Sequence, residues 1–274
     1  HCLPMDFLNE LAGSTAYTFH SHTEFCDGRA TMEAFARQAV AEGFTHYGFT
    51  PHSPVPIMSP CNMHRDNVAR YFAEVERIKR DHPQCRFYAG MEVDYLDGIC
   101  TPQDAYFQSL PLDYMISSIH FVRSQDGEWV DTDGRFESFR RKMDEKFHGD
   151  IMYVVREFFE ASHRMLDLGG FDILGHFDKI RLNASYYHPG IEDTGFYRSL
   201  ADDFTDHIID VASKRQLTVE INTKHYREHG CIFPAERHVE RLLKAGVPMV
   251  VNSDAHVPAL IDASRAYGLS LISK

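Results

Sequence analysis

Short apolar runs, rich in aromatic and β-branched side chains, alternate along the chain with longer stretches in which apolar residues recur every three or four positions. The first pattern is typical of buried β-strands, and the second is typical of helices that bury one face. Seven strand-like runs occur, at residues 16–20, 46–50, 86–93, 114–122, 172–177, 217–222 and 248–254. Helical patterns lie between them, at residues 31–43, 65–82, 136–168 and 234–246, and the third should break near Gly149.

Strands that alternate with helices favour a parallel sheet, because each helix carries the chain back before the next strand begins. Seven such units predict an α/β fold with a closed or nearly closed barrel, and an open, doubly wound sheet is the alternative. We expect one barrel domain over residues 1–274, since α/β barrels of about 250 residues are single domains. Residues 1–14 should form a terminal extension, in part a tag remnant, because the chain begins with His1 rather than Met.

Composition and charge narrow the class of protein. A net charge of -12 repels phosphate backbones, so general nucleic-acid binding is not expected. No apolar run approaches the roughly 18 residues of a membrane span, and the first residues lack the apolar region of a signal peptide. The six cysteines are scattered without a CxxC pair, which predicts free thiols in a reducing compartment, the cytoplasm.

Polar side chains occupy the ends of the strand-like runs or follow them directly. They include His20 and His22, His52, Glu92 and Asp94, His120, His176, Glu220, and Asp254 with His256. In a barrel the C-terminal ends of the strands meet on one face, so these side chains should converge. His20 and His22 are two residues apart, which places both imidazoles on one face of an extended chain, where they can share a metal ion. The set predicts a metal site at the C-terminal ends of the strands.

Six segments, in this order, resemble the motifs of the polymerase and histidinol phosphatase (PHP) family: HSHTEFCDG from residue 20, TPHSP from 50, GMEVDY from 90, SSIHFV from 117, GHFDK from 175 and NSDAH from 252. The resemblance runs from about Tyr17 to His256 and looks closest to the histidinol-phosphate phosphatase branch. It implies a distorted (β/α)7 TIM-like barrel with three divalent metal ions, usually zinc, iron or manganese, in a cleft at the strand C-termini.

Carried over motif by motif, the resemblance implies three overlapping sets of metal ligands. The first set is His20, His22, Glu92 and Asp254, the second is Glu92, His120 and His176, and the third is Asp27, His52 and His256. Glu92 would bridge the first two ions. Some relatives carry His at the position of Asp27, so the third site could differ in its metal or its affinity.

Such a cluster would hydrolyse a phosphomonoester by attack of a metal-bound hydroxide, since bound metals lower the pKa of water towards about 7. The catalytic residues would then be Glu92, Asp254 and His256, with Asp254, His256 or a metal-bound water as the general acid. Arg181 and Arg227 follow the fifth and sixth strands, and their guanidinium groups suit phosphate oxygens. The resemblance also places phosphate-binding arginines in these two loops, and Ser253 and Lys179 could contribute.

The leading interpretation is a phosphatase that converts L-histidinol phosphate to L-histidinol and phosphate in histidine biosynthesis, acting on a small phosphorylated substrate as a monomer or small homo-oligomer. Spare carboxylates such as Asp94 or Glu24 would favour the cationic amino group of that substrate. The alternatives are a PHP phosphoesterase for nucleotides, phosphotyrosine or sugar phosphates, and a non-catalytic metal-binding protein. The long loop at residues 124–137 is expected to be either a lid over the site or a solvated turn.

Overall fold

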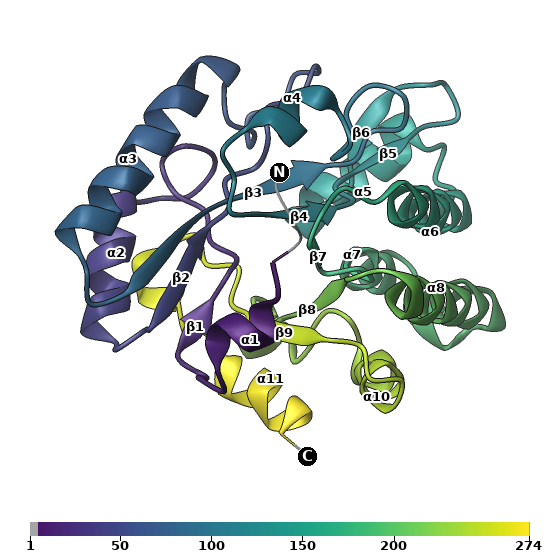
Figure 1. Ribbon diagram of the computed structural model, residues 1–274. Coiled ribbons are helices and arrows are strands. Elements are labelled where there is room, and N and C mark those ends of the chain that lie inside the picture. The colour runs from purple at the N-terminus through teal and green to yellow at the C-terminus, as the bar shows by residue number, and fades with distance from the viewer. Residues whose placement is uncertain (1–4, 274) are drawn as a thin grey trace.

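The computed structural model describes residues 5–273, and its centre is a sheet of seven parallel strands (Figure 1). Neighbours in the sheet follow the order of the chain, as repeated strand–helix units require. The strands are β1 (Tyr17–Thr18), β2 (His46–Phe49), β3 (Arg86–Asp94), β4 (Tyr114–Ser118), β7 (Ile173–Leu174), β8 (Thr218–Asn222) and β9 (Met249–Asn252).

The sheet curls until its two edge strands meet. The end of β1 and the end of β9 share a parallel bridge between Ser21 and Ala255, and the backbone N–H of His22 donates to the carbonyl oxygen of Ala255 at 2.8 Å. The side chain of Asn252 accepts a hydrogen bond from the N–H of Phe19 at 2.8 Å. The predicted barrel is therefore confirmed, and it is nearly closed rather than an open sheet.

Helices surround the strands (Figure 1). They are α1 (Phe7–Leu11), α2 (Met32–Ala41), α3 (Val68–Asp81), α4 (Ala105–Ser109), α5 (Phe136–Lys146), α6 (Ile151–Leu168), α7 (Ile180–Tyr187), α8 (Gly195–Lys214), α9 (Tyr226–His229), α10 (Glu236–Lys244) and α11 (Arg265–Ile272). The predicted break near Gly149 is confirmed: α5 ends at Lys146, Gly149 has a positive φ of 72°, and Asp150 caps α6 by accepting from the N–H of Tyr153. None of the helices in the described part of the chain is long and apolar enough to cross a bilayer.

The predicted strand at residues 114–122 is shorter than expected. The chain leaves the barrel after Ser118 and forms a separate antiparallel hairpin from β5 (Phe121–Arg123) and β6 (Trp129–Asp131). The apolar run continues from β4 into β5 because the inner face of the hairpin is also buried, with Val122 of β5 paired to Val130 of β6. The loop expected at residues 124–137 is thus partly an ordered hairpin.

The end of the barrel at which the strands begin is closed by aromatic side chains. Phe7 of α1 packs edge-on against Phe19 and Tyr114, with ring centroids 4.8 and 5.5 Å away. The Tyr114 ring fits because Gly48 and Gly90 lack side chains: a Cβ atom on Gly48 would lie 1.9 Å from the Tyr114 hydroxyl. The described part of the 1–14 extension thus belongs to the barrel core, and residues 1–4 lie outside the described range.

Replacing Phe7 with Ala should lower the free energy of unfolding by about 3 kcal/mol, because the ring is 1% exposed and its loss leaves a cavity in the aromatic closure. Urea denaturation measures this change. The neighbouring variant Leu8→Ala is the matched control, since Leu8 is 51% exposed, and it should change stability little. Equal stabilities for the two variants would show that α1 does not close the barrel.

His238 of α10 is fully buried and held in its neutral form. The Thr205 hydroxyl donates to the carbonyl oxygen of Ala201 and so accepts from Nδ1 of His238 at 2.8 Å, while Nε2 of His238 accepts from Arg237 at 3.1 Å. Protonation would remove the second hydrogen bond. Burial accordingly lowers the pKa of His238 to about 4.

This low pKa predicts a loss of stability in acid. The unfolded chain binds a proton at His238 near pH 6.5 but the folded chain does so only near pH 4, so the stabilisation is complete above pH 6.5 and falls as the pH drops towards 4. At fixed metal content, the loss between pH 7 and 5 should be about 2 kcal/mol smaller in His238→Gln than in the wild type. The exposed His64→Gln variant should keep the wild-type dependence, and a wild-type dependence in His238→Gln would refute the assignment.

Candidate metal centre

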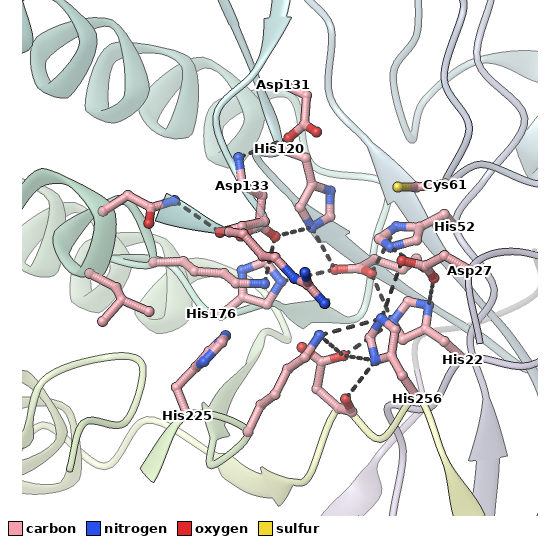
Figure 2. A pocket seen from close by; sticks show the side chains of 18 of the residues that line it. His22, Asp27, His52, Cys61, His120, Asp131, Asp133, His176, His225 and His256 are labelled. Carbon is pink, nitrogen blue, oxygen red and sulfur yellow. Dashed lines mark hydrogen bonds and ion pairs between the residues drawn. The ribbon is translucent and has the colours of Figure 1, made fainter. Parts of the chain in front are cut away.

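The structure brings all nine predicted metal ligands together at the C-terminal ends of the strands. Figure 2 labels six of them: His22, Asp27, His52, His120, His176 and His256. The nine ligands fall into four overlapping groups whose ligand atoms lie within 4.8 Å of one another. The groups are His22, Asp27, His52 and His256; His20, His22 and Glu92; His20, His176 and Asp254; and His52, Glu92 and His120. They form the floor of a cavity of about 820 Å³, and eight of the nine, all except His20, line it directly.

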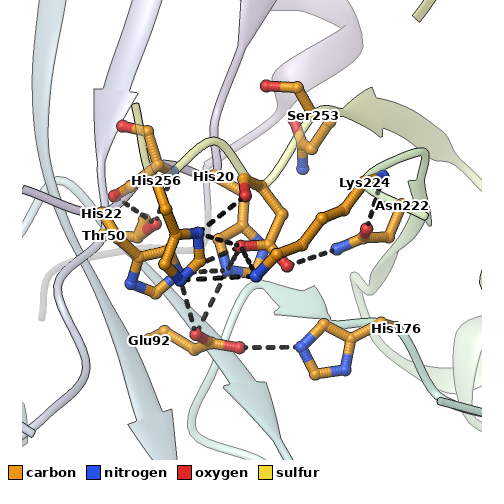
Figure 3. A network of polar contacts seen from close by, with 12 residues as sticks. His20, His22, Thr50, Glu92, His176, Asn222, Lys224, Ser253 and His256 are labelled. Atoms are coloured by element: carbon orange, nitrogen blue, oxygen red, sulfur yellow. Dashed lines mark hydrogen bonds and ion pairs between the residues drawn. The ribbon is translucent and has the colours of Figure 1, made fainter. Parts of the chain in front are cut away.

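Glu92, near the end of β3, lies at the centre of the cluster with no exposed surface. Its Oε2 atom is 3.1 Å from Nε2 of His20 and 3.2 Å from Nδ1 of His52, while Oε1 is 3.1 Å from Nε2 of His176 and 3.4 Å from Nε2 of His120. The two oxygens therefore face different histidines on opposite sides, as Figure 3 shows for His176 and the pair His20 and His22. A carboxylate in this position can bridge two ions.

Outer carboxylates fix the orientation of two of these rings. Nδ1 of His20 lies 2.6 Å from Glu220, and Nδ1 of His120 lies 2.6 Å from Asp94. Because an ionised carboxylate only accepts hydrogen bonds, each Nδ1 carries a proton and each Nε2 faces the cluster, where it would bind a metal ion once deprotonated. Glu220 is itself held by the N–H of His176 and by the side-chain amides of Asn222 and Asn252.

Asp27 faces two histidines on the more exposed side of the cluster. Its Oδ1 atom is 3.7 Å from Nε2 of His52, and its Oδ2 atom is 3.4 Å from Nε2 of His256. The ring of His22 lies against both histidines, with centroids 4.4 Å from His52 and 4.2 Å from His256. These four side chains can surround one ion.

The electrostatics of the cluster favour anionic carboxylates. Burial would raise the pKa of Glu92, but His20, His120 and His52 outweigh it and hold that pKa well below its usual range. Burial likewise opposes ionisation of Asp254, and Lys224 and His20 hold its pKa well below normal. The carboxylates are therefore ready to bind cations at neutral pH.

The hydrogen bonding of the cluster fits divalent metal ions. Oδ1 of Asp27, Oε2 of Glu92 and Oδ1 of Asp254 are buried carboxylate oxygens that accept no hydrogen bond. Burial disfavours a charge on His20, but Glu220 and Glu92 outweigh it and raise the pKa of His20 well above its usual range, so without a metal ion Nε2 of His20 carries a proton that faces Glu92 and His22, each 3.1 Å away. Buried acceptors that face one another are costly unless a cation lies between them, and a set of imidazole and carboxylate donors suits borderline divalent ions.

Of the four candidates for phosphate binding, Lys179 lines the described cavity, and Arg181, Arg227 and Ser253 do not. The guanidinium of Arg181 donates to Asp178, Glu192 and the carbonyl oxygen of Ile232, and these three partners direct it away from the cluster. Arg227 is exposed on α9, and Ser253 is buried beside Thr18.

The two carboxylates suggested for a substrate amino group are not available for that role either. Asp94 is buried and accepts from His120 and from the amide of Asn62, so its oxygens are already engaged. Glu24 is exposed and lies outside the cavity lining.

Other charged residues line the cavity instead. Lys179 and Lys224 reach its floor. The exposed side chains at its edge include two cations, Arg29 and Arg135, and two anions, Glu137 and Glu228. The hairpin adds Asp131 and Asp133 to the wall. Sequence reasoning missed most of these residues, although Lys224 directly follows a strand, as the metal ligands do, and could have been found by the same rule.

Comparison with known proteins connects this geometry to a family. The PHP domain family model matches residues 18–224 of the chain. A probable histidinol-phosphatase of Deinococcus radiodurans is 24% identical over 244 residues, which cover 87% of this chain and 85% of the relative.

Two solved structures share the fold. A candidate histidinol phosphatase of Listeria monocytogenes has a TM-score of 0.78 at 21% identity and covers 92% of this chain and 99% of its own. The histidinol phosphate phosphatase of Lactococcus lactis, solved with zinc, L-histidinol and phosphate, has a TM-score of 0.70 at 17% identity and covers 94% of this chain and 93% of its own. At these identities the similarity establishes the barrel alone.

Replacing Glu220 with Gln should weaken metal binding by about tenfold or more, because the neutral amide no longer fixes the proton on Nδ1 of His20. Competition with a fluorescent chelator measures this affinity. Glu76→Gln is the matched control, since Glu76 is on the surface of α3, and it should bind metal as the wild type does. Unchanged affinity in Glu220→Gln would show that the orientation of His20 does not depend on this contact.

Proposed function

The chain belongs to the PHP domain family, and from that premise we propose that it is a metal-dependent phosphomonoesterase that hydrolyses L-histidinol phosphate to L-histidinol and phosphate. The observation that carries the proposal is the cluster of nine histidine and carboxylate side chains around Glu92 at the floor of the cavity. The relatives are named for the same substrate, and their similarity covers most of this chain.

We assign three ions to the cluster. His20, His22, Glu92 and Asp254 would hold the first, Glu92, His120 and His176 the second, and Asp27, His52 and His256 the third. The opposed oxygens of Glu92 support its bridging role between the first two. Zinc, iron and manganese all suit these donors, and zinc has the support of the Lactococcus lactis structure.

Divalent ions in this cluster would supply an activated water and offset the charge of the phosphate group. The protein's part is to fix the donors: Glu92 between two ions, Asp254 through the amide of Asn222 at 3.1 Å, and His256 through its Nδ1 contact with the carbonyl oxygen of Asp254 at 3.0 Å. We assign Glu92, Asp254 and His256 to catalysis. Of the candidates for protonating the leaving alkoxide, His256 is favoured over Asp254, because it is the more exposed of the two and the pKa of Asp254 is held well below its usual range.

The edge of the cavity suits the rest of the substrate. The amino group of histidinol phosphate is cationic at neutral pH, and Glu137 and Glu228 are exposed acids in the lining. Glu137 has no ion-pair partner within residues 5–273, so it is free to pair with a cation. The five cysteines in that range form no disulfide, which agrees with the reducing cytoplasm in which we place histidine biosynthesis.

Phosphate release from histidinol phosphate should exceed release from phosphotyrosine, a nucleoside monophosphate and a sugar phosphate by about tenfold or more in kcat/KM. Its cationic amino group lies close to the phosphate, whereas in phosphotyrosine an aromatic ring separates the two and the other substrates lack the cationic amino group. In His20→Ala the activity should fall to about 1% or less, with a parallel loss of bound metal. A strong chelator should have the same effect on the wild type.

Two results would contradict the proposal. Broad activity across the substrate panel would leave a PHP phosphoesterase of another specificity. Full metal content without turnover of any substrate would leave a metal-binding protein that is not an enzyme.

A further inference from the structure

A phosphomonoester brings close to two negative charges to a site built from carboxylates. The chain therefore needs cations beside the cluster to hold that group. Arg181 is engaged by three partners elsewhere, and Arg29 and Arg135 are exposed at the edge. The cations that approach the cluster are Lys179, after the end of β7, and Lys224, after the end of β8.

Lys224 faces the part of the cluster that contains Asp254 and His256. Its Nζ atom lies 3.5 Å from Oδ1 of Asp254 and 3.3 Å from Nε2 of His256, as Figure 3 shows. Its backbone is fixed because its N–H donates to Oδ1 of Asn222 at 3.1 Å. The first ion, held in part by Asp254, and the third, held in part by His256, would engage these two atoms, and the ammonium group, 29% exposed on a flexible stem, would then pair with the nearest other anion.

Lys179 approaches from the side of His120 and His176. It is 9% exposed, and its Nζ atom lies 2.6 Å from Oδ2 of Asp133, which in turn is 4.0 Å from Nε2 of His120. Asp133 belongs to the segment that follows β6, and its N–H donates to Oδ1 of Asp131 at 2.8 Å. The hairpin thus holds this lysine at the cluster, whereas Lys224 has freedom to move.

The two lysines lie over the same end of the barrel. β7 and β8 are adjacent parallel strands, with Leu174 paired to Val219, so side chains beyond their ends project over the same face of the barrel. His225 lines the cavity (Figure 2), and burial together with the charges of Lys179 and Lys224 lowers its pKa to about 3. The ring of His225 is therefore neutral and does not compete with either lysine for an anion.

We infer that Lys179 and Lys224 form the phosphate clamp of this site, one on each side of the metal cluster, and that Arg181 has no part in phosphate binding. This inference rests on the proposed function for its phosphorylated substrate. It assigns both lysines as substrate-binding residues, with Asp133 as the positioning residue for Lys179.

Titration calorimetry with inorganic phosphate on metal-loaded protein tests the clamp without any substrate turnover. Lys224→Gln and Lys179→Gln should each weaken phosphate binding by about tenfold or more, because each loses a charge-assisted hydrogen bond. Metal content, measured by mass spectrometry, should be unchanged. Lys224→Arg should restore most of the affinity, and the Arg181→Gln variant should bind phosphate as the wild type does.

Two matched variants separate the clamp from other effects. Lys244→Gln removes the same charge from the exposed end of α10, near the start of β9 and away from the cavity, and should leave phosphate binding unchanged. Asp133→Asn keeps Lys179 but removes the ion pair that positions it, so phosphate affinity should fall, and by less than in Lys179→Gln. A loss in Asp133→Asn that exceeds the loss in Lys179→Gln would show that Asp133, and not the lysine, is what phosphate binding needs.

Wild-type phosphate affinity in either lysine variant, or loss of metal from it, would overturn the inference. Absence of phosphate binding to the metal-loaded wild type would do so as well. If the lysines govern phosphate binding but histidinol phosphate is not hydrolysed, the proposed substrate is wrong and the clamp stands.

Discussion

The buried carboxylate of Glu92 is the constraint on which the rest of the site depends. An ionised carboxylate without exposed surface is costly unless several partners compensate its charge. Here five histidines from four different strand ends approach its two oxygens within 3.4 Å. Only a fold in which the strand ends converge can supply partners from such distant parts of the chain, and the nearly closed barrel does so.

A residue between two ligands also helps to hold their side chains in place. Ser21 lies between His20 and His22, and its side chain points the other way: its hydroxyl donates to the carbonyl oxygen of Gly48 at 2.9 Å, and its N–H donates to the Thr50 hydroxyl at 3.0 Å. These contacts tie the end of β1 to the end of β2. The two imidazoles therefore share one face because the residue between them is anchored on the other.

Periodicity was sufficient to predict the barrel, and eight of the nine candidate ligands lie at the strand ends to which it pointed. The ligand sets, with Asp27 among them, were implied by the resemblance to the PHP family. The sequence did not predict where the guanidinium of Arg181 lies. The position of this residue after a strand suited phosphate binding, but its long side chain donates to Asp178, Glu192 and a carbonyl oxygen far along the chain. The hairpin was missed for a related reason. A buried apolar run looks the same whether it continues in one strand or leaves the sheet after Ser118.

The two ends of the barrel have opposite chemistry, and the difference follows from what each end must do. At the C-terminal ends, buried oxygens of Asp27, Glu92 and Asp254 accept no hydrogen bond, and each such atom costs about 1–3 kcal/mol without a cation. At the other end, Phe7 and Tyr114 bury whole aromatic rings, and each ring stabilises the fold by a similar amount. The same strands run through both ends, so the apolar closure keeps the barrel folded while the polar end is held ready for cations. The fold can therefore contain a site rich in unpaired acceptors, because burial of aromatic rings at the opposite end of the same strands offsets the free energy that the site costs.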